Sequence, residues 1–221
     1  MTLVSEKNNF LYLTVGIVLL FFLAALVDQV GFLSTHLIQA FSVVNILIGL
    51  YGFKSDTSWF SSKLGKIVII VGVIALGGLF EYFKLSYMHL VALFFFYIWA
   101  IWFAMKQVLF SGKVDANKIV GAICIYLLMG LIWAMMYLFI AQAVPGAFNG
   151  IEQQVWYDNF GIVAYYSFVT LTTLGYGDIS PVAPVARFLV YMEAVVGVFY
   201  MAILVASLIG VGINESRNQH H

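Results

Sequence analysis

Long runs of apolar residues, separated by short polar segments, dominate the chain. A transmembrane helix needs about 20 mostly apolar residues. Six long apolar runs are present, at residues 10–27, 31–53, 67–83, 88–110, 119–143 and 187–213. Residues 28–30 leave space for only a tight turn, so the first two helices should be antiparallel. The pattern predicts an all-α membrane protein with six transmembrane helices.

Composition supports the same class. Of the 221 residues, 63% are hydrophobic and 9% are charged, whereas soluble domains carry about 25% charged residues. Ten Lys and Arg balance ten Asp and Glu, which gives no electrostatic case for a nucleic acid partner. The one cysteine, Cys124, excludes a disulfide within the chain and a cysteine-built metal site.

The distribution of basic residues predicts the orientation, because cytoplasmic loops carry an excess of Lys and Arg. With a cytoplasmic N-terminus, the inner set is Lys7, Lys54, Lys63, Lys66, Lys106, Lys113, Lys118 and Arg217, and the outer set is Lys84 and Arg187. This arrangement places both termini in the cytoplasm.

The segment between the fifth and sixth runs has an internal structure of its own. Residues 144–159 are typical of an exposed loop, and residues 160–171 predict a short helix with Asp158 or Asn159 as N-cap. That helix would be about 18 Å long, too short to span a bilayer. Residues 173–178 predict an irregular strand. We therefore expect a re-entrant helix and loop, a four-helix domain at 1–110 and a pore domain at 111–221.

Residues 172–178 read Thr-Thr-Leu-Gly-Tyr-Gly-Asp. This segment resembles the potassium channel family, whose signature is Thr-Val/Ile-Gly-Tyr-Gly-Asp, with Leu174 in place of Val or Ile. The resemblance extends over residues 119–213. It implies an integral membrane channel, in a plasma membrane, that binds K⁺ at its filter residues Thr173, Leu174, Gly175, Tyr176 and Gly177.

The chemistry of ion transfer explains this motif. A cation that loses its water needs rings of backbone carbonyl oxygens in exchange. Placing successive carbonyls on one side requires alternating backbone conformations, which glycine supplies without steric cost. One chain provides one wall, so three identical subunits must join it in a homotetramer. Apart from K⁺, no cofactor is expected, and no residue cluster supports an enzyme.

One side chain of the short helix and one at the end of the filter motif are candidates for support of the filter. In many members of the family an aromatic residue donates a hydrogen bond to the filter aspartate, and the matching pair here is Tyr165 and Asp178. Val169 stands where some bacterial members have a carboxylate, so no carboxylate pair forms.

Glu193 is the acid that lies well inside an apolar run. Intramembrane ionisable residues are usually functional or paired. We expect Glu193 to be protonated and to form a hydrogen bond with Thr170 or Thr172 behind the filter. Direct ion binding is the alternative.

The last run contains candidates for a hinge and a cavity. Gly197 resembles the hinge glycine of the family's inner helix, and close helix packing explains it equally well. Val198, Met201, Val205 and Ile209 share one helical face and would line a cavity, or else pack between helices.

Six runs with the pore last resemble the voltage-gated channel superfamily, but the fourth run lacks the arginines that a voltage sensor needs. Strong voltage gating is therefore not expected. The second run carries His36, Gln39 and Asn45, which suit interhelical hydrogen bonds or, alternatively, a ligand pocket. His89 is expected to be interfacial.

The sequence thus predicts a homotetrameric channel that conducts K⁺ passively. A weakly selective cation channel and a ligand-responsive subunit that senses through the four-helix half are the alternatives. The gating stimulus does not follow from the residues.

Overall fold

The computed structural model describes residues 9–30, 36–52, 83–109 and 116–218. Nearly all of the third apolar run lies outside these residues. The same holds for five lysines of the inner set: Lys7, Lys54, Lys63, Lys66 and Lys113. The described elements are α1 (Asn9–Val30), α2 (His36–Gly52), α4 (Phe83–Leu109), α5 (Ala116–Ala143), β1 (Phe148–Asn149), α6 (Phe160–Leu171), β2 (Ser180–Pro181) and α7 (Pro184–Asn218).

Apolar helices make the chain an all-α membrane protein. Within the described residues, α1, α4, α5 and α7 contain stretches that are long and apolar enough to cross a membrane: Phe10–Val30, Ser86–Val108, Asn117–Ala143 and Pro184–Leu204. The apolar part of α2, His36–Leu50, is shorter. The prediction of six spans goes beyond these four helices and stays a prediction.

Several helices begin or end outside the predicted runs, and two of these differences bear on the pore half or its neighbours. The tight turn predicted at residues 28–30 was wrong, because these residues form the last turn of α1. α7 begins at Pro184 and not at Arg187. Proline suits the first turn of a helix, where its missing N–H group would have no partner.

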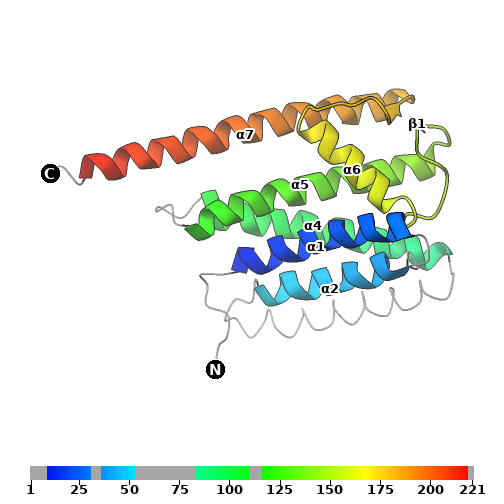
Figure 1. Ribbon diagram of the computed structural model, residues 1–221, viewed down its shortest axis with the longest axis horizontal. Helices are drawn as coiled ribbons and strands as arrows, with labels where there is room; N and C mark the ends of the chain where they lie inside the picture. Colours follow the sequence, from blue (N-terminus) through cyan, green and yellow to red (C-terminus); the bar gives the residue numbers. More distant parts are fainter. Residues whose placement is uncertain (1–8, 31–35, 53–82, 110–115, 219–221) are drawn as a thin grey trace.

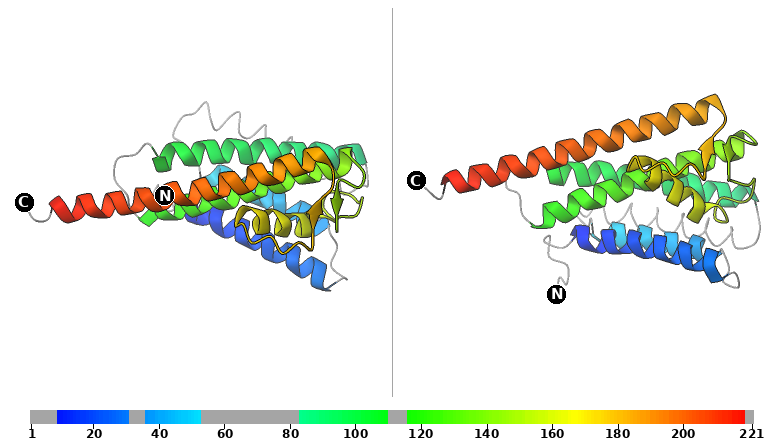
Figure 2. Two further views of the ribbon diagram at one scale, coloured as in Figure 1. Left: turned by 90° about the horizontal axis from the view of Figure 1, so that it is seen from above. Right: turned by 45° about the horizontal axis from the view of Figure 1, so that its top comes forward.

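α5 lies at the centre of the bundle (Figure 1). It packs against α1, α4, α6 and α7, and α1 also packs against α2. Half of the α5 span (50%) is buried, whereas only 11% of the α7 span is. The core contains Ile17 and Leu20 of α1, Leu93 and Tyr97 of α4, and Leu128, Leu131 and Tyr137 of α5. α7 therefore lies at the side of this core, and its C-terminal end extends past the other helices (Figure 2).

The loop before α6 is more ordered than the sequence predicts. β1 pairs with β2 in an antiparallel ladder, with Phe148 opposite Pro181 and Asn149 opposite Ser180. The expectation of an exposed loop over 144–159 was wrong for Phe148 and Trp156, which are 4% and 0% exposed. The indole of Trp156 donates to the carbonyl of Ser86 at 2.9 Å, so an aromatic anchor ties this loop to α4.

Candidate functional site

α6 covers residues 160–171, the range that the sequence predicts for the short helix. Its N-cap is Asn159, but the Asn159 side chain makes no capping hydrogen bond. Its φ of −94° and ψ of −3° are helical, whereas a capping residue is normally extended. Its amide instead donates to the carbonyl of Glu152 at 2.7 Å. The N-cap position was therefore predicted correctly, but the Asn159 side chain does not cap the helix.

A carboxylate from another helix lies at this same end of α6. A methyl group added at Gly161 would meet Oδ2 of Asp28 from α1. The N-terminal end of a helix carries a partial positive charge, so a carboxylate beside it is favourable. Gly161 thus allows α1 and the first turn of α6 to approach closely.

The C-terminal end of α6 holds the start of the filter segment, residues 172–178. The amide N–H groups of Leu174 and Gly175 donate to the carbonyl of Val169 at 2.9 and 3.2 Å. The N–H of Thr173 donates to the carbonyl of Thr170 at 2.9 Å. The backbone therefore folds back on the last helical turn, and any displacement of α6 moves the filter segment.

Every second residue of the filter segment has a positive φ angle. The values are 60° at Thr173, 56° at Gly175 and 82° at Gly177. Among the described residues, Thr173 is the one non-glycine residue with a positive φ. Such a conformation costs an L-residue free energy and persists only where the surroundings enforce it. Alternation of this kind directs successive carbonyls to the same side of the chain, as the sequence argument requires.

The filter segment is exposed in one chain. The side chains of Leu174 and Tyr176 are 54% and 67% exposed. A methyl group added at Gly175 or Gly177 would have no atom within 4 Å. The filter segment is therefore largely uncovered in one chain.

The hydrogen bond expected between Tyr165 and Asp178 is present. The Tyr165 hydroxyl donates to Oδ2 of Asp178 at 2.7 Å. The other carboxylate oxygen, Oδ1, accepts from the N–H of Ile179 at 3.0 Å. The hydrogen bond to Asp178 raises the pKa of the Tyr165 hydroxyl above its usual value. Val169 is buried and provides no carboxylate here.

Glu193 is fully buried, but its predicted partners were wrong. Its carboxyl group contacts the hydroxyl of Tyr137 from α5 and, at 2.5 Å, the hydroxyl of Ser167 from α6. The hydroxyl of Thr172 donates instead to the carbonyl of Phe168 at 2.6 Å. The reason is the register of α7 against α6, which places Glu193 one helical turn before the level of Leu171. A serine within the apolar sequence of α6 was the available signal for this contact.

Gly197 lies one turn further along α7, against the filter end of α6. A methyl group at this position would collide with the carbonyl of Leu171. Val198 and Met201 are 53% and 45% exposed, so neither packs closely against the rest of the chain. Val205 and Ile209 belong to α7, but their side chains lie outside the part of the structure that is described.

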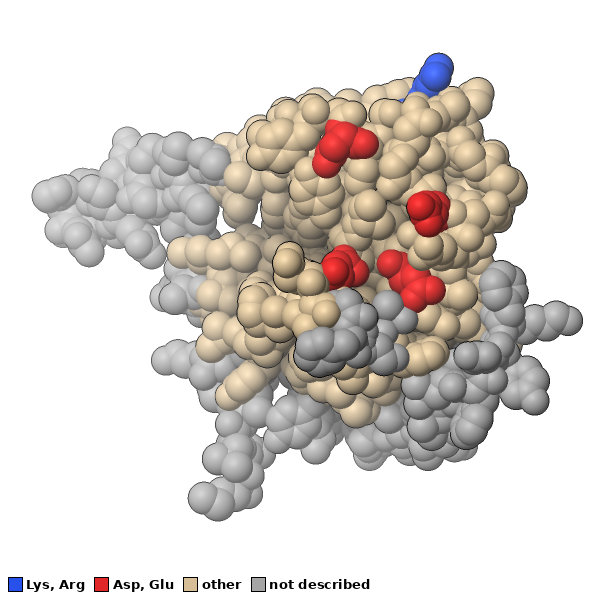
Figure 3. All heavy atoms as spheres, turned by 45° about the vertical axis from the view of Figure 1, so that its right-hand side comes forward, with Lys and Arg blue, Asp and Glu red and all other residues tan. Residues whose placement is uncertain are grey.

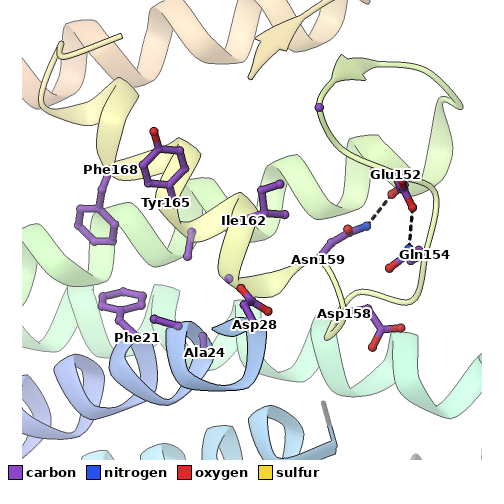
Figure 4. Close-up of a pocket in the computed structure, with 14 residues that line it drawn as sticks. Phe21, Ala24, Asp28, Glu152, Gln154, Asp158, Asn159, Ile162, Tyr165 and Phe168 are labelled. Carbon is purple, nitrogen blue, oxygen red and sulfur yellow. Dashed lines mark hydrogen bonds between the residues drawn. The ribbon is translucent and has the colours of Figure 1, made fainter. Parts of the chain in front are cut away.

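A cavity of about 730 Å³ flanks α6 on the side of α1 (Figure 4). Its apolar end contains the rings of Phe21 and Phe168, which meet edge to face with centroids 5.1 Å apart. Its other end is lined by Asp28, Glu152 and Asp158. Figure 3 shows acidic side chains spread over this end of the molecule. Negative charge thus gathers near the filter segment, where Asp178 is also exposed.

The polar residues of α2 make contacts within the helical bundle. The amide of Asn45 donates to the carbonyl of Gly16 in α1 at 2.9 Å, and the hydroxyl of Ser42 lies 3.3 Å from Nε2 of His89 in α4. His89 is 0% exposed, so its ring packs inside the bundle, and its placement at the membrane interface stays a prediction. It packs against Trp156, which the loop brings over it. The ring of His36 lies against Tyr157, and the buried amide of Gln39 has no hydrogen bond among the described residues.

Comparison with known proteins connects the second half of the chain to ion channels. Residues 121–213 match a family model described as ion channel. No curated protein and no solved structure matches the chain. The matched residues include α6, the filter segment and most of α5 and α7. The match therefore supports an ion channel, integral to a membrane and built from more than one subunit.

Proposed function

We propose that the chain forms a potassium-selective channel, a homotetramer that conducts K⁺ passively across a plasma membrane. Its termini are cytoplasmic, residues 1–110 form a helical domain, and residues 111–221 form the pore domain. The observation that carries the proposal is the alternating backbone of the filter segment, held on the end of α6 and exposed in one chain.

The filter segment supplies the oxygen atoms that replace the water around K⁺. The carbonyls of residues 173–176 and the Thr173 hydroxyl would form successive rings around the axis, and Gly177 continues the alternation. Rings of closely spaced carbonyl dipoles suit a weakly hydrated monovalent cation, which passes from ring to ring at little net cost.

Four chains are needed because each contributes one wall. Residues 172–178 are all exposed in one chain, and the α7 span is the least buried of the four candidate spans. Both features support contact with further copies of the chain. A ring of four would cover Leu174 and Tyr176 and leave their carbonyls toward the axis.

α6 acts as the pore helix in this arrangement. The C-terminal end of a helix carries a partial negative charge, and in α6 this end meets the filter segment directly. Four such ends around one axis favour a cation between them. Asp178 and the acidic residues at the same end of the molecule would raise the local K⁺ concentration at the entrance.

The four-helix half of the chain, residues 1–110, differs from a voltage sensor. α4 carries Lys106 in its last turn, and its ammonium group lies over the ring of Trp102 at 3.7 Å. A cation held on an aromatic ring at a helix end suits an interfacial anchor more than a charge that crosses the membrane field. The proposal therefore includes no strong voltage gating.

Reversal potentials test the function. The purified chain would be reconstituted in a planar bilayer with K⁺ on one side and Na⁺ on the other. We expect the reversal potential to follow the K⁺ gradient, and native mass spectrometry to detect a tetramer. A current that follows both cations equally would indicate the weakly selective alternative, and a stable dimer would contradict the four-wall arrangement.

A further inference from the structure

Glu193 joins three helices at the back of the pore helix. Its carboxyl group is fully buried and contacts the hydroxyls of Tyr137 in α5 and Ser167 in α6. The Ser167 hydroxyl also lies 2.8 Å from the carbonyl of Gly130 in α5. These four polar groups thus form one continuous network, which runs from α5 through α7 and α6 back to α5.

The number of hydrogen atoms available for bonding among these four groups depends on the protonation state of Glu193. Ser167 has one hydroxyl hydrogen, but it has two possible acceptors, Gly130 and Glu193. If Glu193 is ionised, one of these two contacts has no hydrogen atom. If Oε1 of Glu193 carries a proton, it donates to Ser167, which donates to Gly130, while Tyr137 donates to Oε2. Three hydrogen atoms then make three hydrogen bonds.

The surroundings favour the protonated state as well. Tyr137 and Tyr126 from α5, and Tyr166 from α6, are the titratable groups that interact with the Glu193 carboxyl. All three are neutral when protonated, and no basic group interacts with Glu193 among the described residues. A buried carboxylate without a cation is strongly disfavoured.

The network is close enough to the filter to affect it. Ser167 lies two residues before Val169, whose carbonyl holds Leu174 and Gly175. One turn after Glu193, Gly197 lies against the carbonyl of Leu171. The position of α6 between α5 and α7 therefore determines where the filter segment begins.

We propose that Glu193 carries a proton in the conducting state and acts as a positioning residue, which fixes the pore helix through Tyr137, Ser167 and Gly130. This inference rests on the proposed potassium channel function. Loss of the proton removes one hydrogen bond from the network, because Ser167 turns from Gly130 to the carboxylate, and leaves an uncompensated charge beside α6. Conduction then falls at alkaline pH.

Infrared spectroscopy tests the protonation independently of any ion current. Glu193→Gln is the matched variant, because its carbonyl can accept from Tyr137 and its amide can donate to Ser167. At neutral pH we expect the full chain to show the carbonyl band of a protonated carboxyl group, and the variant to lack it. Tyr137→Phe, which removes one donor, should shift this band to higher frequency. Identical spectra for all three proteins would overturn the proposal.

The pH profile of the K⁺ current tests the positioning role. The wild-type current should decline as the pH rises, in step with the loss of the infrared band, whereas Glu193→Gln should conduct without this decline. Ser167→Ala should lower the current about fivefold, as the loss of one hydrogen bond permits, and Ser167→Thr should restore it. A wild-type current that stays constant while the band disappears would overturn the positioning role. A wild type without K⁺ current would refute the proposed function, while the infrared result would still stand.

Discussion

Gly197 of α7 lies directly against the main-chain carbonyl of Leu171, the last residue of α6. Because the contact involves backbone atoms, no change of the Leu171 side chain could make room for a larger residue at position 197. Of the two interpretations that the sequence leaves open for Gly197, a hinge or close packing, this contact supports packing.

Replacement of Gly197 by alanine should destabilise the assembly. Alanine is favoured over glycine in a helix by about 1 kcal/mol, but overpacking in a closely packed region costs about 1–3 kcal/mol. We therefore expect the contact to outweigh the helix preference and the variant to be less stable than the wild type. The thermal midpoint of the purified protein is the measurement, with Val18→Ala, at an exposed position of α1, as control. A Gly197→Ala protein that is more stable and differs only in gating would support the hinge instead.

Tyr165→Phe should weaken the outer end of the filter. The change keeps the ring and removes the hydroxyl that donates to Asp178 at 2.7 Å. We expect shorter openings or faster inactivation in single-channel records, with the tetramer intact. Tyr191→Phe, at an exposed tyrosine of α7, is the control. If Tyr165→Phe leaves kinetics and selectivity unchanged while Tyr165→Ala fails to assemble, the residue serves packing alone.

Alanine variants at two glycines distinguish the effect of backbone strain from the loss of ion binding. Gly175 and Gly146 have φ angles of 56° and 73°, and a methyl group at either position would have no neighbour within 4 Å. Alanine in such a conformation costs about 1–2 kcal/mol in each case. We expect Gly175→Ala to lose selective K⁺ current and Gly146→Ala to retain it, with similar yields of tetramer. Equal currents in the two variants would contradict the role of residues 173–176 as ion ligands.

Voltage should have little effect on opening. Each charge that crosses the membrane contributes about 2.3 kcal/mol per 100 mV, and the basic residue in the last turn of α4, Lys106, is held on Trp102. Open probability in reconstituted bilayers should therefore change only slightly between about −100 and about +100 mV. Steep, saturating activation would show that charges of the four-helix half move through the field.

The acidic end of the molecule should increase conductance at low ionic strength. Glu152→Gln and Asp158→Asn each remove a negative charge there, and we expect smaller currents at about 0.01 M salt, where the Debye length is about 30 Å, with little change at about 0.15 M. Arg187→Gln, which removes a positive charge from an exposed position of α7, should have the opposite effect. Changes of the same sign in all three variants would exclude a local electrostatic origin.

Local patterns in the sequence predict the pore helix well. The apolar run at residues 160–171 is bounded by Asn159 on one side and by the filter segment on the other, and the helix has these limits. The partner of Asp178 is also predictable, because the resemblance of the motif points to Tyr165. Both predictions depend on residues within a short stretch of chain.

Contacts between distant segments could not be predicted in the same way. The partners of Glu193 depend on the register of α7 against α6, and the Gly197–Leu171 contact that sets this register has no local pattern. Trp156 stands in a segment with Pro, Gly and acidic residues, and its burial depends on α4, which is distant in sequence. The number of subunits depends on copies of the chain that a single sequence does not contain.

The short ladder between β1 and β2 connects the ends of two long helices. The N–H groups of Val182 and Ala183, just before α7, also donate to the carbonyl of Ala147, four residues after the end of α5. The ladder therefore closes the loop that contains α6 and the filter segment, and it fixes the start of α7 close to the end of α5. A change in bilayer thickness that tilts α7 should tilt α5 with it.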